Sequence, residues 1–473
     1  MSHAIVWFRR DLRLQDNPAL HHALAQGYQV IPIYIYAPKE ETPWPIGRAS
    51  RWWLHHSLQA LNIALRTKHS RLLFFQGCSL PVLQNLIHST QAKAVYWNHL
   101  SEPAIITRDN TIKTALRAKG IIAQGFKADL LHEPWTIHTH AGKPYQLFTP
   151  FWRTCQRSLL SELPLTTPLI FKAHQLWPSS LKLADLKLLS GCSANEFAQV
   201  WQPGEAGAWQ RLQQWCSGPI SYYAEQRDFP GIDGVSRLSP HLHFGEISPR
   251  QVIGAVEYAL HYLNGRVRGI QNYERQLFWR EFAYYLLYHY PHTPEQPLRS
   301  VFKKFPWRTD YQKLFKAWQQ GQTGYPLVDA GMRELLTTGW MHNRVRMVAA
   351  AFLTRNCAIP WQEGAYWFWE HLVDADLANN TLGWQWVAGC GADAIPYHRI
   401  FNPLLQSTRF DPQGNYLQRW LPELAGLSPQ YRHRPWLAQL QLDYPSPIID
   451  YMQSRREALD AYQHLNKSPI EQD

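Results

Sequence analysis

One stretch of the chain, residues 223–251, gathers the residue types that bind a phosphate. Ser239 and Ser248 each precede a proline, which predicts two helices with the serine as N-cap and the proline as first residue. Ser236 and Arg237 come just before the first of these helices, so hydroxyls, a guanidinium and free backbone N–H groups meet at one helix start. Such a helix start can bind a phosphate or pyrophosphate, although an ordinary capped helix with an exposed arginine explains the same residues.

A second set of polar and aromatic side chains lies on the predicted helix 271–290. Gln276, Trp279 and Arg280 are three and four residues apart, so they share one face of that helix. Together they could hydrogen-bond to a base-like ligand and stack on it. A helix edge with a half-buried tryptophan and two solvated polar groups is an equally simple alternative.

Polar residues also interrupt apolar sequence further on. Asn343, Arg344 and Arg346 lie within the predicted helical stretch 329–352 and need partners if they are buried there. The stretch 371–403 adds carboxylates, amides and indoles, namely Asp374, Asp376, Asn379, Asn380, Trp384 and Trp386. The polar groups could hold a metal ion, bind a ribose or cap helices. A metal site has little support, because no histidine or cysteine joins them at ligand spacing.

These residues need a scaffold, and the sequence predicts one with two kinds of domain. Over residues 1–130, β-rich runs alternate with helical stretches, which predicts a Rossmann-like α/β domain with a parallel, helix-covered sheet. Its predicted strands are 3–8, 30–36, 71–75 and 94–97. Scattered proline and serine over 131–200 indicate a connector, and helical periodicity over 201–473 predicts a large all-α domain.

Composition excludes several classes of protein. The 473 residues are 45% hydrophobic and 18% charged, which suits buried cores, and no apolar run reaches the ~18 residues of a membrane span. The apolar stretch before Arg9 is too short for a signal peptide, and six cysteines without a CxxC pair suit a reducing, cytoplasmic location. The net charge of +11 fits a polyanionic partner, and 22 tryptophans supply either a large aromatic core or stacking surfaces for flat ligands.

Six segments, in the order in which they occur, resemble the photolyase/cryptochrome family: RDLRLQDNPAL, GVSRLSPHLHFGEISPRQ, QLFWREF, TGYPLVDAGMREL, GWMHNRVRM and DADLANNTLGWQWVAG with DAIPYHRIFNP. They extend over nearly the whole chain, which makes the resemblance far more specific than a single motif. The similarity is greatest to class I photolyases, which repair cyclobutane pyrimidine dimers in DNA. It implies an α/β antenna domain followed by a helical domain that binds FAD.

The resemblance also implies which residues bind FAD. Tyr223 and the loop 235–239 would bind the FAD phosphates, the loop consisting of Val235, Ser236, Arg237, Leu238 and Ser239. The residues that would line the flavin and hold its ribose and ring edge are Arg280, Asn343, Arg346, Asp374, Ala375 and Asp376. Asn380 would face flavin N5, where an amide, a poor proton donor, favours the fully reduced anion. Many relatives have threonine in place of Val235, so one hydroxyl contact is missing while the backbone donors remain.

Other residues would handle electrons and DNA by the same resemblance. Trp384, Trp361 and Trp307 match the tryptophan chain that connects the flavin with the surface. Trp279 and Trp386 match the walls around a dimer flipped out of the duplex. The residues expected at the DNA-facing side are Arg227, Gln276, Asn343, Arg344, Arg399 and Gln406. Gln276 departs from the glutamate that most dimer photolyases carry there.

The implied reaction is light-driven electron transfer from reduced FAD to a pyrimidine dimer in UV-damaged DNA, by a monomer that binds no membrane or metal. The antenna pigment is expected to be methenyltetrahydrofolate, with a deazaflavin as the alternative. A (6-4) photolyase would carry histidines in place of Asn343 and Met347. A signalling cryptochrome would usually carry a long low-complexity tail, whereas here only a short helical stretch follows residues 421–424. The two tryptophan walls argue against a non-catalytic flavoprotein.

Overall fold

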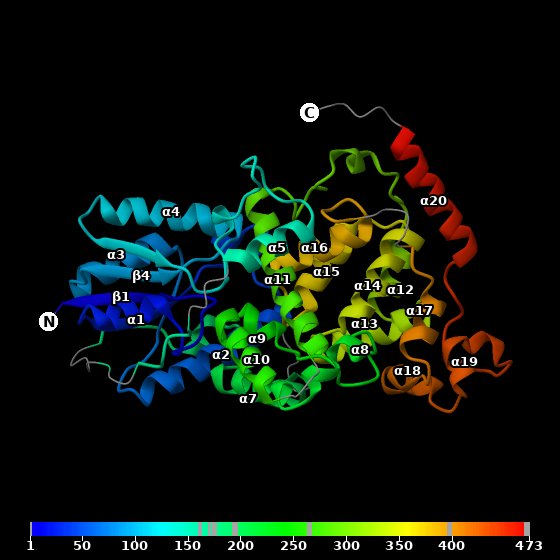
Figure 1. Cartoon of the computed structure of the whole chain (residues 1–473), viewed down its shortest axis with the longest axis horizontal. Helices are drawn as coiled ribbons and strands as arrows, with labels where there is room; N and C mark the ends of the chain where they lie inside the picture. Colours follow the sequence, from blue (N-terminus) through cyan, green and yellow to red (C-terminus); the bar gives the residue numbers. More distant parts are fainter. Residues whose placement is uncertain are drawn as a thin grey trace.

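The computed structural model describes residues 2–158, 163–168, 171, 177–191, 197–262, 267–394 and 400–467. The N-terminal part forms a five-stranded parallel sheet in the order β3-β2-β1-β4-β5, seen in blue and cyan in Figure 1. The strands are β1 (His3–Phe8), β2 (Gln29–Tyr36), β3 (Leu73–Gln76), β4 (Ala94–Asn98) and β5 (Ile122–Phe126). The predicted α/β class is confirmed, and β5 is an additional strand that the sequence did not predict.

Helices cover both faces of this sheet, which explains why its strands are apolar on both sides. The helices α1 (Pro18–Ala25) and α2 (Arg48–Arg66) pack with Val6 and its neighbours on one face. The helices α3 (Ser79–Thr90) and α4 (Pro103–Arg117) pack with Ile5 on the other face. The strand order reverses between β1 and β4, and in such sheets a crevice opens at the carboxyl ends of the strands where the order changes.

The rest of the molecule is helical and lies beside the sheet, from green to red in Figure 1. Its principal helices are α7 (Glu205–Cys216), α10 (Pro249–Tyr262), α11 (Val267–His289), α12 (Gln312–Gln319), α13 (Pro326–Thr338), α14 (Asn343–Ala351), α15 (Trp361–His371), α16 (Leu377–Ala388), α17 (Pro403–Phe410), α18 (Asn415–Trp420) and α20 (Tyr451–Lys467). Short helices between them include α8 (Tyr223–Gln226), α9 (Ser239–His243) and α19 (Pro429–His433). The predicted all-α domain is confirmed.

Two local predictions need correction. The helical stretch 329–352 is broken into α13 and α14, because Gly339 adopts a left-handed conformation (φ 69°) that ends the first helix. The next helix begins after His342, whose side chain accepts the N–H of Arg344. Ser239 is not an N-cap but the first residue of α9, and its Oγ lies 3.4 Å from Trp340 Nε1 instead.

The second predicted cap is confirmed. Ser248 Oγ accepts the N–H of Gln251 at 3.0 Å, and Gln251 Oε1 accepts the N–H of Ser248 at 2.8 Å. This reciprocal pair satisfies two backbone groups at the start of α10.

The segment between the two domains is more structured than a plain connector. It contains α5 (Phe148–Ser158), which lies beside α11 in Figure 1, and α6 (Phe197–Val200). The predicted boundaries at 130 and 200 stay predictions.

A buried polar network joins the sheet to the helices. Arg13 donates to the carbonyls of Ala128 (3.2 Å) and Gly245 (2.8 Å), and its side chain is 1% exposed. Asp16, which is fully buried, accepts from Ser248 Oγ at 2.5 Å and from Arg250 Nη2 at 2.8 Å. Each charged group here is paired, as burial requires.

Candidate functional site

A cavity lies among the helices around the polar residues that the sequence singled out. We call it the helical cavity; its volume is about 620 Å³, open mouth included. It is lined by Asn343, Arg346, Met347, Ala350, Phe368, Leu372, Asp374, Asp376, Asn379, Asn380, Gly383 and Trp384. The start of α14, the turn before α16 and the first half of α16 supply most of this lining. Five of the predicted FAD-binding residues therefore meet at one cavity, together with the predicted electron carrier Trp384.

An arginine and a carboxylate are fixed against each other in its wall. Arg346 Nη2 donates to both carboxylate oxygens of Asp374, at 3.0 and 2.9 Å. Arg346 Nε donates to the carbonyl of Met341 at 2.7 Å, which holds the guanidinium plane. The side chain of Asp374 is 4% exposed, so Arg346 is the partner that this buried carboxylate requires. The cavity thus presents a preorganised cation and anion side by side.

Asp376 is held even more tightly. It caps α16, where its Oδ1 accepts the N–H of Asn379 at 2.8 Å, while its Oδ2 accepts from Tyr284 and from His243 Nδ1 at 3.3 Å. Burial would raise the pKa of Asp376, but His243, Arg280 and Tyr284 outweigh it and hold that pKa well below its usual range. Asp376 therefore stays an anion at any physiological pH and can accept hydrogen bonds from a ligand.

An amide lies next to these anions. Asn380 Nδ2 donates to the carbonyl of Ala365 at 3.1 Å, which fixes the side chain at the cavity wall.

The loop 235–239 is connected with the helical cavity through the indole of Trp340. The guanidinium of Arg237 lies 5.0 Å from the ring of Trp340, and that of Arg346 lies 5.8 Å from the same ring. Ser236 Oγ accepts from the hydroxyl of Tyr273 at 3.0 Å. Tyr223 packs edge-on against Tyr273, at 5.4 Å between ring centroids. Tyr223 and the predicted phosphate loop thus form one cluster that joins the helical cavity at Trp340.

Arg280 lies apart from the residues lining the helical cavity. Its Nη2 pairs with Asp129 Oδ1 at 2.7 Å, and its Nη1 donates to the carbonyl of Asp129 at 2.8 Å. The guanidinium lies over the ring of Tyr284, which bonds to Asp376. The structure therefore places Arg280 behind Asp376, between the sheet domain and the helices.

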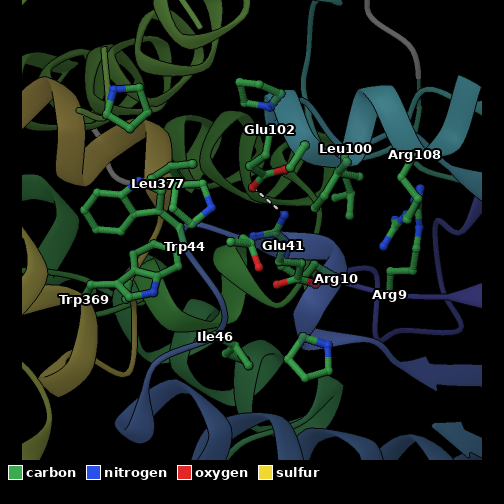
Figure 2. Close-up of a pocket in the computed structure, with 18 of the residues that line it drawn as sticks. Arg9, Arg10, Glu41, Trp44, Ile46, Leu100, Glu102, Arg108, Trp369 and Leu377 are labelled. Atoms are coloured by element: carbon green, nitrogen blue, oxygen red, sulfur yellow. Dashed lines mark ion pairs between the residues drawn. The ribbon is translucent and has the colours of Figure 1, made fainter. Parts of the chain in front are cut away.

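A second cavity opens at the carboxyl ends of β1 and β2, at the strand-order reversal. We call it the strand-end cavity; its volume is about 1170 Å³, open mouth included. Figure 2 shows Arg9 and Arg108 on one side of it and Trp44, Trp369 and Leu377 on the other. Between them Arg10 is paired with Glu102, an ion pair drawn as a dashed line. Its other lining residues include Tyr34, Tyr36, Glu41, Leu100, Ile105, His243, Phe244 and Ala375.

The electrostatics of the strand-end cavity differ from those of the helical cavity. Burial raises the pKa of Glu41 above its ordinary value, although Arg10 and Arg108 oppose the shift. Glu102, whose side chain is only 6% exposed, forms an ion pair with Arg10. The site is flat-walled, aromatic and partly cationic.

One short segment separates the two cavities. Asp374 and Asp376 line the helical cavity, whereas Ala375 and Leu377 line the strand-end cavity. The wall between the cavities is therefore a single run of chain whose side chains alternate between them.

Comparisons with known proteins identify the family. The sequence matches the family DNA photolyase over residues 4–169 and the FAD binding domain of DNA photolyase over residues 273–464. It is 43% identical to the deoxyribodipyrimidine photo-lyase of Agrobacterium fabrum, over 98% of this chain and 98% of that protein. The chain belongs to the DNA photolyase/cryptochrome family. It is also 38% identical to cryptochrome-2 of Arabidopsis thaliana, over 98% of this chain and 79% of that protein.

A solved structure agrees with this membership. The crystal structure of a bacterial class III photolyase from Agrobacterium tumefaciens has a TM-score of 0.94 and 43% identity, and it covers 99% of this chain and 98% of its own. The resemblance to the DNA photolyase/cryptochrome family is thus confirmed, while the narrower similarity to class I has no specific support.

The tryptophans expected to carry electrons in a photolyase are placed unequally. Trp384 is buried at the helical cavity, and its ring centroid lies 5.0 Å from Phe368 and 6.3 Å from Trp318. Trp361, at the start of α15, is 2% exposed. Trp307 is half-buried and packs against Phe305 at 4.4 Å. Trp318, which the sequence did not single out, is the tryptophan in edge contact with Trp384.

The arginines expected at the DNA side of a photolyase meet at one carboxylate. Arg344 Nη2 pairs with Asp228 Oδ1 at 2.9 Å, and Arg227 Nε lies 3.8 Å from the same oxygen. The guanidinium of Arg344 also lies 4.4 Å from the ring of Phe410 on α17. Sequence reasoning missed Asp228, since nothing in its position next to Arg227 indicates that it reaches α14.

The remaining predicted DNA contacts are scattered. Gln276 and Trp279 are half-buried on α11, and Trp386 is half-buried on α16. Gln406 lies on α17, the helix that carries Phe410. Arg399 lies outside the described residues.

In the described part of the chain, no helix is long and apolar enough to cross a membrane. Among the same residues, no group of three or more histidine, cysteine, aspartate or glutamate side chains is arranged to hold a metal ion.

Proposed function

We propose that this protein is a light-dependent lyase that splits cyclobutane pyrimidine dimers in UV-damaged DNA, with FAD bound in the helical cavity. The observation that carries the proposal is the helical cavity itself, in which the paired Arg346 and Asp374, the anion Asp376 and the amide of Asn380 face Trp384. Its likeness over 98% of both chains to a deoxyribodipyrimidine photo-lyase supports the same reaction.

The donor set of the helical cavity fits a flavin dinucleotide. A cation, two anions and three amides can serve the polar edge of the flavin and its ribose, while Trp384 offers an apolar face. The loop 235–239 and Tyr223 supply hydroxyls, a guanidinium and backbone N–H groups for the phosphates. Arg280 would act from behind Asp376 by stabilising its charge.

Reduced FAD, when bound and excited by light, supplies the electron that opens the cyclobutane ring and takes it back afterwards. The protein's own residues would bind and orient FAD and the dimer and exclude water from them. The amide of Asn380 offers no acidic proton, so it favours the anionic reduced state of whatever flavin faces it. Trp384 would pass an electron inward when the flavin needs reduction, with Trp361 and Trp307 as the proposed continuation to the surface.

DNA would bind over the mouth of the helical cavity. Photolyases flip their target out of the duplex, and Trp279 and Trp386 are the proposed walls for the flipped dimer. Arg227 and Arg344 are proposed phosphate contacts, with Gln276, Asn343, Arg399 and Gln406 completing the surface. The net charge of +11 supports such a polyanionic partner, whose binding should weaken steeply with salt.

The strand-end cavity is the proposed site of the antenna pigment. It lies where α/β folds place their ligands, and its aromatic walls and arginines suit a flat pigment with an acidic tail. We propose methenyltetrahydrofolate as this pigment, with a deazaflavin as the alternative. The absorption spectrum of the purified protein distinguishes them.

We further propose a class III rather than a class I assignment, since the 43% identical crystal structure is that of a class III photolyase. A monomer in the cytoplasm is the proposed working form. Repair of (6-4) lesions is disfavoured because Asn343 and Met347 line the helical cavity where a (6-4) enzyme would need histidines. The neighbouring His342 cannot replace them: its ring is buried, its Nδ1 accepts the Arg344 N–H, and burial lowers its pKa to about 3.

The test is anaerobic illumination of the reduced protein with each purified lesion. We expect cyclobutane dimers to be restored to monomers and (6-4) products to remain. Repair of (6-4) products alone would overturn the substrate assignment. Repair of neither lesion by protein that binds FAD would favour the cryptochrome alternative, which the 38% identity to cryptochrome-2 keeps open.

A further inference from the structure

One face of Trp279 is already occupied inside the protein. The ring of Phe148, the first residue of α5, lies 3.8 Å from the ring of Trp279 between centroids, with only 7° between their planes. Phe148 is 1% exposed, whereas Trp279 is half-buried. Because an aromatic ring has two faces and Phe148 covers one, a flipped base can stack only on the other.

Neighbouring side chains hold this stacked pair in place. Phe282 meets both rings edge-on, at 5.9 Å from Phe148 and 5.9 Å from Trp279. Arg275, one turn before Trp279 on α11, lies 5.2 Å from the ring of Phe148 and 5.0 Å from that of Trp152. Trp152, one turn after Phe148 on α5, is nearly parallel to it, at 6°. The α5–α11 contact is therefore a set of parallel and edge-on rings in which Phe148 is central.

We propose that Phe148 is a positioning residue for the lesion: by stacking behind Trp279, it fixes the plane on which the flipped dimer docks. This inference rests on the proposed function, since it concerns the wall that Trp279 provides. Holding that ring before DNA arrives lowers the ordering cost of binding, which a freely turning indole would incur at each encounter. The segment between the two domains thereby contributes to recognition of the lesion.

Simple core packing would not require this geometry. Phe151, three residues further along α5, is equally buried and packs against Phe282 at 5.1 Å and Tyr285 at 4.8 Å, and both contacts are tilted. Phe148 is parallel both to Trp152 at 6.2 Å and to Trp279 at 3.8 Å, and only the contact with Trp279 is this close. Phe151 therefore offers a matched control for the loss of one buried ring from the same helix.

The experiment compares Phe148→Leu with Phe151→Leu in the full-length, FAD-loaded protein. Leucine keeps the site apolar but removes the flat face. We expect Phe148→Leu to weaken binding of a dimer-containing oligonucleotide by roughly tenfold, because the indole of Trp279 then no longer offers a fixed plane on which a base can stack. FAD content, binding of undamaged DNA, its salt dependence and turnover at saturating DNA should stay as in the wild type. Phe151→Leu should leave all of these unchanged.

A double substitution and a rescue separate positioning from general destabilisation. In a Trp279→Leu background, Phe148→Leu should cause no further loss of dimer binding, because no indole remains to be held. Phe148→Tyr, which keeps the flat ring, should retain wild-type affinity for the dimer. Wild-type affinity of Phe148→Leu, or equal losses in the Phe148 and Phe151 variants, would overturn the proposal. Failure of the wild type itself to bind dimers would instead overturn the proposed function.

Discussion

The two cavities of this photolyase-family protein are built in different ways, although one run of chain separates them. Among the described residues, those that line the helical cavity all lie within 343–384, a stretch of sequence rich in motifs. The described lining of the strand-end cavity comes from the ends of β1 and β2, the loops after β1, β2 and β4, α2 and α4, and from residues 243–244, 291–295 and 369–377. The difference shows that a site carried by one continuous stretch can be recognised in sequence, whereas a site assembled by the fold needs the structure.

The two cavities also differ in how they shift the pKa values of their buried carboxyl groups. In the helical cavity, Asp376 stays ionised because His243, Arg280 and Tyr284 hold its pKa well below its usual range. In the strand-end cavity, burial raises the pKa of Glu41 despite two nearby arginines. If the two sites bind different groups, substitutions in one should leave the other loaded.

The largest expected effect is the loss of FAD from Arg346→Leu. Asp374 would keep a buried charge without its cation, and breaking a buried ion pair in this way costs roughly 3–5 kcal/mol. The flavin-to-protein absorbance ratio of the purified variant should fall to near zero, while a pigment in the strand-end cavity is retained. The control is Arg333→Leu, which breaks an ion pair with Glu423 away from both cavities and should keep FAD. Full FAD content in Arg346→Leu would remove the helical cavity as the flavin site.

Trp384→Phe should abolish photoreduction of oxidised FAD and leave repair by chemically reduced protein intact. Trp384 lines the helical cavity, whereas Trp369 lines the strand-end cavity. Trp369→Phe is therefore the matched control and should photoreduce normally, with any change confined to the antenna spectrum. Blue light with an external reductant provides the assay. Normal photoreduction by Trp384→Phe would exclude it as the electron carrier.

A pH effect is expected at the seam between the two domains. Glu281 on α11 accepts the N–H groups of Leu131 and His132, at 2.9 and 3.0 Å, and burial raises its pKa to about 7. In the unfolded chain a glutamate has a pKa of about 4.3. Between that pH and the folded-state pKa, Glu281 is protonated in the folded protein and ionised in the unfolded chain. The free energy of unfolding therefore falls as pH rises through this range. Glu281→Gln keeps the acceptor oxygen without the charge. Its stability relative to the wild type should grow by up to about 3 kcal/mol from pH 4.5 to pH 8.

Urea denaturation at several pH values measures this difference. Glu457→Gln, an exposed substitution on α20, should show no such trend. A constant difference between Glu281→Gln and the wild type across the range would contradict the assigned cause.

The smallest expected effect is that of Gln276→Glu on α11. Glutamine keeps hydrogen-bonding capacity but offers no acidic proton or charge, so repair of cyclobutane dimers should already proceed in the wild type. The substitution should keep the repair rate or raise it modestly under anaerobic illumination, without changing FAD content. A large loss of dimer repair would show that the amide itself is needed.

The sequence predicted much of this architecture because its signals were local. Asn343, Arg346 and Asp374 were expected at one site because the resemblance to the photolyase/cryptochrome family implies it, and all three line the helical cavity. The break at Gly339 was missed because the apolar periodicity continues on both sides of it. The fifth strand was missed because IAQGF carries glycine and a polar residue in place of a β-branched run.

Contacts between segments that are distant in the chain could not be predicted from the sequence. Asp228 reaches Arg344 across more than a hundred residues, and Phe148 reaches Trp279 from a segment that sequence alone indicated to be a connector. Such pairs depend on how helices pack, which residue type and spacing do not determine.

The buried network around Arg13 and Asp16 has a consequence for how the molecule folds. Separating the domains would break the hydrogen bonds that the buried Asp16 carboxylate accepts from Ser248 and Arg250. We therefore expect the two domains to unfold together, despite their different architectures. Calorimetry should record one cooperative transition, and two resolved transitions would show that the network is dispensable. If the two domains unfold together, the distance between a pigment at the strand ends and a flavin among the helices is fixed throughout the native state and does not vary through a hinge.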